Sequence, residues 1–311
     1  MGNGRISMYH FIVNRYSMSG KSGQVWDELE EILKEKNVDY VTYTTKAVGH
    51  ATDLAREITS AEGDIQLGVF GGDGTLNEVL NGIVDFSRVE MTYIPCGSAN
   101  DFAKGVGITG DPTEVLKRVL ETPTTIQVDL GQVNSDDGKS RIFGVSAGIG
   151  VDALVCKQVN EGNLKKILNR LGIGEATYGL TTVGDICTMP FADGTISYGD
   201  YKEHVRGIIF AAAMNSAYEG GGIPMVPYAN HTSGVLSALV AHDIPRLACF
   251  PMLLKVIKGK HQGTKGCSFY DFDEMKIVVD RPLCVHADGE HVGFHKTVSF
   301  KCLPGILKLK W

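Results

Sequence analysis

The sequence lacks the features of membrane-spanning, secreted and zinc-binding proteins. It contains no apolar run long enough to cross a bilayer and no recognisable signal peptide. Its seven cysteines are scattered and odd in number, and none are in CxxC spacing. We therefore expect reduced thiols in a cytosolic protein rather than a disulfide framework or a zinc site. Met1-Gly2 does not begin a myristoylation motif, because Ile6 stands where Ser or Thr is required.

A large excess of charge is also absent. The formal net charge is −6, which argues against bulk nucleic-acid binding. Hydrophobic residues make up 43% and charged residues 21% of the chain, as in ordinary globular proteins with a buried core. The 311 residues are about right for two domains, and we find no internal repeat, coiled coil or low-complexity tract.

An alternation of strand and helix patterns predicts an α/β domain over the first 125 residues. The expected strands are 8–14, 38–44, 65–70 and 90–95, and the expected helices are 23–36, 51–61, 75–83 and 113–120. This order is typical of a doubly wound, mainly parallel sheet with helices on both faces.

Short strand-like runs separated by turns dominate residues 126–303. They lie at 126–133, 141–147, 205–214, 235–242, 274–279 and 298–303, and helical patterns lie at 153–171 and 244–258. We predict a second, mainly antiparallel domain with the form of a β-sandwich.

Three loops of the first domain carry groups that suit phosphate binding. The first is Gly71-Gly72-Asp73-Gly74-Thr75-Leu76-Asn77, which joins an apolar strand to a helix. Backbone N–H groups and a helix N-terminus favour negative charge at such a place. The alternative is a tight turn in which Asp73 only caps the helix.

The other two loops also follow predicted strands. Asn14 to Gly23 contains Lys21 but is no Walker A loop, because Arg15 stands where that motif needs Gly. Pro95 to Ala103 contains Asp101, which we expect to lie at the same sheet edge as Asp73. Two carboxylates beside a triphosphate suggest Mg²⁺ held partly through water.

Two stretches of the second domain are also candidates for a functional site. Residues 148–153 match a GxGxx(G/A) pattern, but no clean βαβ unit follows, so we favour a close-packed turn over a dinucleotide site. Asp288-Gly289-Glu290 is either an exposed hairpin or a general base with a partner. The spacing of His286, His291 and His295 fits no standard zinc pattern, so we interpret these histidines as bystanders.

Read in order, these stretches resemble the catalytic domain of the diacylglycerol kinase family, especially soluble bacterial lipid kinases. The matching segments are GGDGTLNEVLNG (71–82), PCGSANDFA (95–103), GIGVDA (148–153), Asn215 with 220–222 and Pro227, and ADGE (287–290). The resemblance spans nearly the whole chain. NAD kinases share the GGDG loop and a related fold, but the 95–103 segment is similar to that of the lipid kinases.

The resemblance implies an ATP-binding α/β domain (1–125), a β-sandwich domain (126–303) with the lipid cleft at the interface, and return of 304–311 to the first domain. It implies γ-phosphoryl transfer from ATP to the hydroxyl of a diacylglycerol-like lipid. Asp73 and Asp101 would hold Mg²⁺ through water, Asp288 would be the general base, and Glu290 would assist. The implied ATP contacts are Asn14, Lys21, Thr45, Gly71, Gly72, Asp73, Gly74, Thr75, Leu76, Asn77 and Ser98.

Three positions depart from the family pattern. Arg15 follows Asn14 where the family usually has Pro, and Ser98 replaces the usual Thr but keeps the hydroxyl. Ser233 stands where bacterial members have an Asp that helps hold a structural Mg²⁺. We therefore do not expect that metal site, which would involve Asn230, Ser233 and Val235.

The leading hypothesis is a cytoplasmic lipid kinase of phospholipid metabolism that contacts the inner membrane face transiently. The alternatives are a kinase of a soluble substrate such as NAD, and a nucleotide-binding regulator without catalysis. Lys157, Lys165, Lys166 and Arg170 recur at helical spacing, as on a headgroup-binding face or on an ordinary solvated one. The sequence leaves the lipid acceptor, the membrane-contact surface and a homodimer open.

Overall fold

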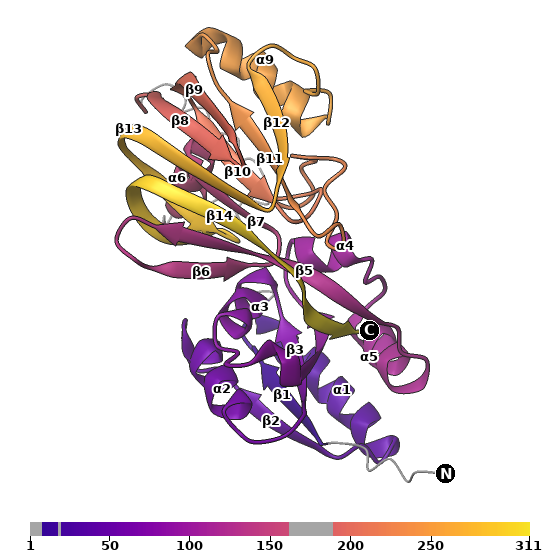
Figure 1. Ribbon diagram of the computed structural model, residues 1–311. Helices are drawn as coiled ribbons and strands as arrows, with labels where there is room; N and C mark the ends of the chain where they lie inside the picture. The colour runs from indigo at the N-terminus through magenta and orange to yellow at the C-terminus, as the bar shows by residue number, and fades with distance from the viewer. Residues whose placement is uncertain (1–7, 18–19, 162–188) are drawn as a thin grey trace. The chain divides into compact units, whose positions relative to one another are not determined.

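The computed structural model describes residues 8–17, 20–161 and 189–311. The chain forms two compact units: residues 1–130 with 304–311 (unit 1), and residues 131–303 (unit 2). Figure 1 labels their helices and strands. Among the described helices, none is both long enough and apolar enough to cross a bilayer.

Unit 1 is built on a parallel sheet in the order β2-β1-β3-β4. Its strands are β1 (Tyr9–Val13), β2 (Tyr40–Thr44), β3 (Ile65–Gly71) and β4 (Val89–Pro95). Its helices are α1 (Ser22–Glu35), α2 (His50–Thr59), α3 (Asp73–Leu80), α4 (Asp101–Val106) and α5 (Pro112–Glu121). The last residues of the chain add a further parallel strand, because Lys308–Lys310 pair with Glu90–Thr92.

Aromatic packing fixes the first helix of unit 1 on its sheet. The buried ring of Trp26 lies between Phe11 and Phe70, with ring centroids 5.3 and 5.2 Å apart. Phe11 in turn covers Gly68, where a Cβ atom would lie 2.0 Å from the ring. The strand therefore needs glycine at this position.

Unit 2 is mainly antiparallel. One sheet path runs β12-β11-β10-β7-β13-β14. Beside this path, β8 pairs with β13, β9 pairs with β8, and β5 pairs with β6. The described strands with residues in unit 2 are β5 (Thr125–Ser135), β6 (Ser140–Phe143), β7 (Ser146–Gly150), β8 (Ala192–Tyr198), β9 (Tyr201–Ile208), β10 (Phe210–Met214), β11 (Leu236–Ala241), β12 (Cys267–Phe272), β13 (Glu274–Ala287) and β14 (Glu290–Lys310). The first part of β5 and the last part of β14 belong to unit 1. Within the described residues of unit 2, the helices are α6 (Val151–Glu161) and α9 (Arg246–Ile257). An apolar core that includes Phe143, Ile149, Ile277 and Phe300 fills the unit.

The predicted fold class, an α/β unit followed by a mainly antiparallel β unit, is confirmed, whereas several element boundaries were wrong. The runs 141–147 and 205–214 each contain two strands rather than one. The periodicity also missed α4, β8 and β12. The expected helix 153–171 begins at Val151, and its part beyond 161 lies outside the described residues.

Candidate active site

Two glycine loops of unit 1 approach each other at the carboxyl ends of β3 and β4. A Cβ atom added to Gly97 would lie 2.5 Å from the Cα atom of Gly72, and one added to Gly72 would lie 3.1 Å from the Cα atom of Gly97. The N–H of Cys96 donates to the carbonyl of Gly71 at 2.8 Å and ties the two loops together. Close backbone approach therefore explains glycine at positions 72 and 97.

Asp73 links these loops through its carboxylate. It is the first residue of α3, with Gly72 as the N-cap, but its side chain serves α4. Its two carboxylate oxygens accept the N–H groups of Asp101 and Phe102, each at 3.2 Å. The structure thus brings Asp73 to Asp101 as expected, by capping the next helix rather than its own.

Asp101 is itself buried, with Lys104 at 3.5 Å from its carboxylate. Asp73 is partly exposed and Asp101 is buried, and both lie in the first turn of a helix, where their carboxylates offer the oxygen ligands that Mg²⁺ prefers. Each oxygen of Asp73 that accepts one N–H has a second lone pair, which is compatible with a metal held through water. The residues fit the implied ion.

The neighbouring strand ends place the other expected nucleotide contacts. Asn14 donates from its side-chain amide to Thr75 Oγ1 at 2.9 Å, and Thr45 donates its N–H to the carbonyl of Val13 at 2.9 Å. The structure therefore gathers Asn14, Thr45 and Thr75 at one edge of the sheet, where α/β proteins bind ligands. Leu76 and Asn77 are buried side chains of α3, so their part in any ligand contact would come from the backbone.

Glu78 holds the loop between β2 and α2, a role that the sequence did not suggest. Its carboxylate accepts the N–H groups of Gly49 and Ala51 at 2.8 and 3.1 Å, at the start of α2. Because Glu78 is one turn beyond the glycine loop, it couples that loop to the segment after Thr45.

Lys21 and Ser98 are exposed, and Arg15 forms an ion pair with Asp27. Lys21 is the residue before α1. The positive charge of Arg15 is therefore paired with Asp27 of helix α1.

Asp288 of unit 2 is held by three backbone donors. Asp288-Gly289 is the two-residue turn between β13 and β14, and both residues have positive φ, 48° and 82°. This Asp-Gly pair is typical of a tight hairpin turn. The Asp288 carboxylate accepts the N–H groups of Gly144, Val145 and Ser146 at 2.8, 2.8 and 3.0 Å. These charge-assisted bonds fix its orientation.

His286 lies just before this turn and is fully buried. Its Nε2 atom is 2.8 Å from Asp152 and 3.7 Å from Glu219. Burial lowers the pKa of His286, but the carboxylates of Asp152, Glu219 and Asp288 outweigh burial and raise it to about 9. The Gly289 N–H lies 3.2 Å from Nδ1, and only the neutral ring has an Nδ1 lone pair that can accept it. The neighbouring carboxylates instead favour the charged ring near neutral pH. Nε2 carries the proton that Asp152 accepts in both forms.

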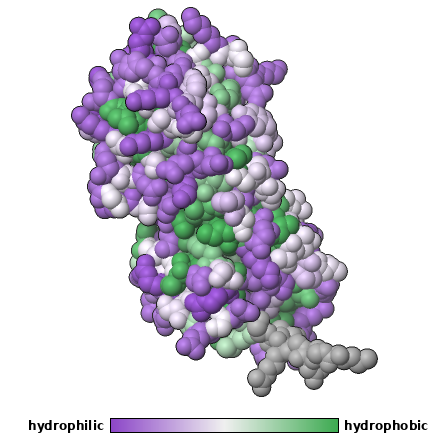
Figure 2. Space-filling model, viewed as in Figure 1, coloured by the Kyte–Doolittle hydropathy of each residue, from purple (hydrophilic) through white to green (hydrophobic). Residues whose placement is uncertain are grey.

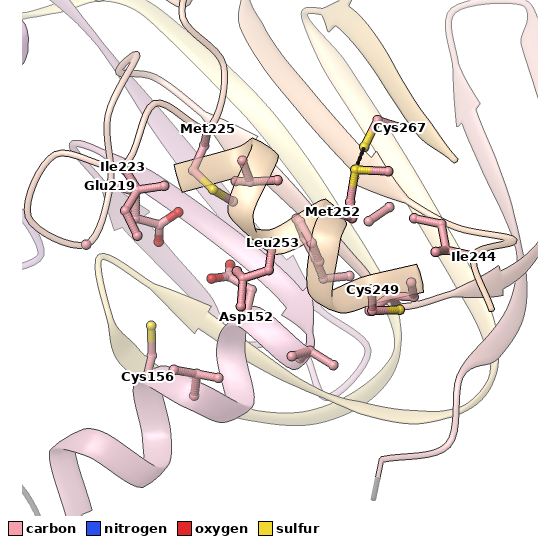
Figure 3. A pocket seen from close by; sticks show the side chains of 17 residues that line it. Asp152, Cys156, Glu219, Ile223, Met225, Ile244, Cys249, Met252, Leu253 and Cys267 are labelled. Atoms are coloured by element: carbon pink, nitrogen blue, oxygen red, sulfur yellow. Dashed lines mark hydrogen bonds between the residues drawn. The ribbon is translucent and has the colours of Figure 1, made fainter. Parts of the chain in front are cut away.

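An apolar cavity of about 140 Å³ adjoins this group (Figure 3). Its charged lining residues are Asp152 and Glu219, which Figure 3 shows near Cys156, opposite α9 residues such as Cys249 and Met252. The ligand atoms of Asp152, Cys156, Glu219 and His286 lie within 4.8 Å of one another. Their imidazole and thiol set them apart from the oxygen ligands of Mg²⁺.

Two members of this group lie in segments to which the sequence analysis assigns other roles. Asp152 belongs to the GIGVDA segment, whose pattern favours a close-packed turn, and His286 precedes ADGE, where its spacing indicates a bystander. The close packing is present, since a Cβ atom on Gly148 would lie 2.5 Å from Asp152 and 2.7 Å from His286. Glu219 gave no signal, because no spacing connects it with the others.

The segment around Ser233 contains the doubted structural metal position. Ser233 Oγ lies 2.9 Å from the carbonyl oxygens of both Asn230 and Val235. Ser233 Oγ is therefore within hydrogen-bonding distance of both carbonyls, and its single hydrogen can be donated to one of them at a time.

Comparison with known proteins decides the family. The diacylglycerol kinase catalytic domain model matches residues 8–133, and the YegS C-terminal NAD kinase beta sandwich-like domain model matches residues 145–310. A Bacillus subtilis protein named "Putative lipid kinase YtlR" is 30% identical over 98% of this chain and 100% of its own length. This chain belongs to the diacylglycerol kinase family. The resemblance seen in the sequence is therefore confirmed.

Solved structures agree on the fold of this family member. A diacylglycerol kinase from Bacillus anthracis has a TM-score of 0.72 at 19% identity, covering 98% of this chain and 97% of its own. An NAD kinase from Archaeoglobus fulgidus, solved in complex with ATP, has a TM-score of 0.51 at 12% identity, covering 98% and 93%. The α/β unit followed by a β-sandwich is shared by all three.

Proposed function

We propose that this kinase transfers the γ-phosphoryl group of MgATP to the hydroxyl of a diacylglycerol-like lipid. One observation carries the choice of acceptor. Ser146 donates its N–H to Asp288 at 3.0 Å and its hydroxyl to Glu219, a lining residue of the apolar cavity, at 2.7 Å. One residue therefore joins the proposed base to the wall of an apolar cavity, where a lipid alcohol can be held.

Unit 1 supplies the proposed nucleotide site. The backbone of Gly71–Asn77, with Asn14, Thr45, Lys21 and Ser98, would bind the phosphates and the nucleoside. Asp73 and Asp101 would hold Mg²⁺ through water, and the ion would neutralise phosphate charge during transfer. The capping bonds from Asp101 and Phe102 keep the Asp73 carboxylate in place for this role.

Unit 2 supplies the proposed base. Asp288 takes the proton of the acceptor hydroxyl while that oxygen forms a bond to the γ-phosphorus. The bond from the γ-phosphorus to the β,γ-bridging oxygen breaks, and ADP leaves. The three N–H donors hold the Asp288 carboxylate in one orientation, and Glu290 at the start of β14 assists. Most of the rate enhancement comes from positioning and charge neutralisation.

A product assay tests the proposal. Purified protein and MgATP are incubated with detergent-dispersed lipid alcohols, including diacylglycerol, and separately with NAD and other soluble alcohols. Mass spectrometry should show a phosphorylated lipid and an unmodified soluble panel. Product formed only without lipid would support a soluble-substrate kinase. ATP-dependent stabilisation with no product on either panel would support a nucleotide-binding regulator.

A lipid acceptor places the enzyme at a membrane surface for part of its cycle. We propose transient contact with the cytoplasmic face of the membrane and a role in phospholipid metabolism. Lys157 of the basic series lies within α6, whereas Lys165, Lys166 and Arg170 lie outside the described residues.

A further inference from the structure

Helix α9 of unit 2 is apolar on two opposite sides. On the inner side, Cys249 and Val256 are buried, and Met252 and Leu253 line the cavity (Figure 3). On the outer side, Leu247 and Leu254 are 84% and 57% exposed. A helix that is apolar all round is normally enclosed. The outer side of α9 is therefore as apolar as a helix face that is normally covered by a partner.

The outer residues form a continuous stripe. Leu247, Pro251, Leu254 and Lys258 are spaced by four, three and four residues, so they follow one face of the helix, and all four are exposed. Ile257, which is 46% exposed, lies beside the stripe. On the face that Figure 2 shows, hydrophobic residues form patches among mostly hydrophilic ones. Single exposed apolar residues are normal, whereas alignment on one helix indicates a binding surface.

The charge around this stripe has one sign. Residues 244–270 contain one arginine, four lysines and no aspartate or glutamate, in a chain with a net charge of −6. The four lysines, all exposed, are Lys255, Lys258, Lys260 and Lys265. Arg246 is engaged within unit 2, where it lies over the ring of Phe191 at 4.4 Å.

We propose that the outer side of α9 docks on the surface of an anionic lipid bilayer, an inference that rests on the proposed lipid kinase function. Leu247, Leu254 and Ile257 would enter the boundary between headgroups and acyl chains, and the lysines would reach the lipid phosphates. The same helix walls the cavity that we assign to the acceptor, so docking brings that cavity to its lipid supply. A second copy of the chain fits less well, because a two-fold contact would set lysine-rich surfaces against each other.

Vesicle binding without ATP tests the surface directly. The full chain is mixed with phosphatidylcholine vesicles that contain about 30% phosphatidylglycerol, which gives the bilayer a negative surface charge. The fraction of protein bound is measured by sedimentation. Each lysine near the surface contributes about a fivefold gain in binding, so K255Q/K258Q/K260Q should bind roughly a hundredfold more weakly. The matched control K202Q/K276Q/K301Q replaces three exposed lysines of unit 2 outside α9 and should bind like the wild type.

The apolar stripe is tested with L247E/L254E against V84E/V278E, which changes exposed valines elsewhere. We expect L247E/L254E to lose vesicle binding, to phosphorylate lipid in vesicles slowly, and to phosphorylate detergent-dispersed lipid at the wild-type rate. Equal vesicle binding by the two double variants would overturn the docking surface. A change from dimer to monomer in L247E/L254E with unchanged vesicle binding would also overturn it and would indicate an interface between copies.

The two proposals fail in different ways. If no lipid is phosphorylated in detergent by the wild type, the proposed function is wrong, whatever the vesicle result. If lipid is phosphorylated in detergent but α9 variants bind vesicles like their controls, only the surface is wrong.

Discussion

Replacing Asp288 with asparagine separates its structural role from its proposed catalytic role. The carboxylate accepts two N–H groups at Oδ1, from Val145 and Ser146, and one at Oδ2, from Gly144. Asparagine can keep the two bonds at its carbonyl oxygen, but its NH₂ group would then face the Gly144 N–H. One unsatisfied donor pair costs about 1–3 kcal/mol of stability. We expect Asp288→Asn to fold with a reduced free energy of unfolding.

Catalysis should suffer far more than stability in this variant. The amide cannot take the proton of the acceptor hydroxyl, so kcat should fall by roughly 10²–10⁴-fold. ATP affinity should be unchanged, because the proposed nucleotide-binding residues lie in unit 1. The measurements are initial rates of lipid phosphate formation, nucleotide titration and denaturant unfolding, all on the same protein preparation.

The matched control is Asp280→Asn, which removes one charge from an exposed ion pair with Arg281. It should leave both stability and kcat close to the wild-type values, because an exposed ion pair contributes little. Wild-type kcat in Asp288→Asn would refute the assignment of Asp288 as the base. A folded variant that has lost ATP binding would refute the division of roles between the units.

The remaining predictions concern the loops and the buried histidines. Gly97→Ala places a Cβ atom 2.5 Å from Gly72, so it should lower the free energy of unfolding by about 1–3 kcal/mol and weaken ATP binding at least tenfold (roughly 1.4 kcal/mol). The control Gly23→Ala, whose Cβ would have no neighbour nearer than 3.6 Å, should bind ATP normally. Equal ATP affinities of the two variants would contradict the argument from close approach. The pKa of His286 is raised to about 9, so its contribution to stability is present below pH 6.5 and lost as the pH rises through 9. In His286→Gln, the free energy of unfolding measured with denaturant should fall less steeply over this pH range. The same fall in wild type and variant would show that His286 is not its cause. Burial lowers the pKa of His231 to about 4, so stability should fall as the pH drops from 6.5 toward 4, by up to roughly 3 kcal/mol. His231→Gln should reduce this acid loss, and the same acid slope in both proteins would contradict it.

The sequence predicted the α/β unit well because local patterns specify it. β1 and β3 are mainly apolar runs, β2 alternates, and the glycines at 71, 72 and 97 mark the loops that carry the candidate nucleotide site. The α4 helix was missed because it has six residues, too few to show a helical period, and begins only where Asp73 caps it.

Long-range pairing made unit 2 harder to predict. Strands such as β8 and β12 gain their order from partners far along the chain, and the hairpin at Asp288 extends strands that look shorter in the sequence. The group of Asp152, Glu219 and His286 joins a helix, a loop and a strand that are up to 134 residues apart. Residue spacing cannot reveal such a group, whereas the Asp-Gly turn beside it was visible as a hairpin signal.

The most direct test of the account is the transfer of an ¹⁸O-labelled γ-phosphoryl group from MgATP to lipid, followed by mass spectrometry. We predict a lipid phosphate whose three non-bridging phosphate oxygens carry the label and whose ester oxygen is the unlabelled acceptor hydroxyl. Label found only in inorganic phosphate, or only on a water-soluble acceptor, would contradict the account.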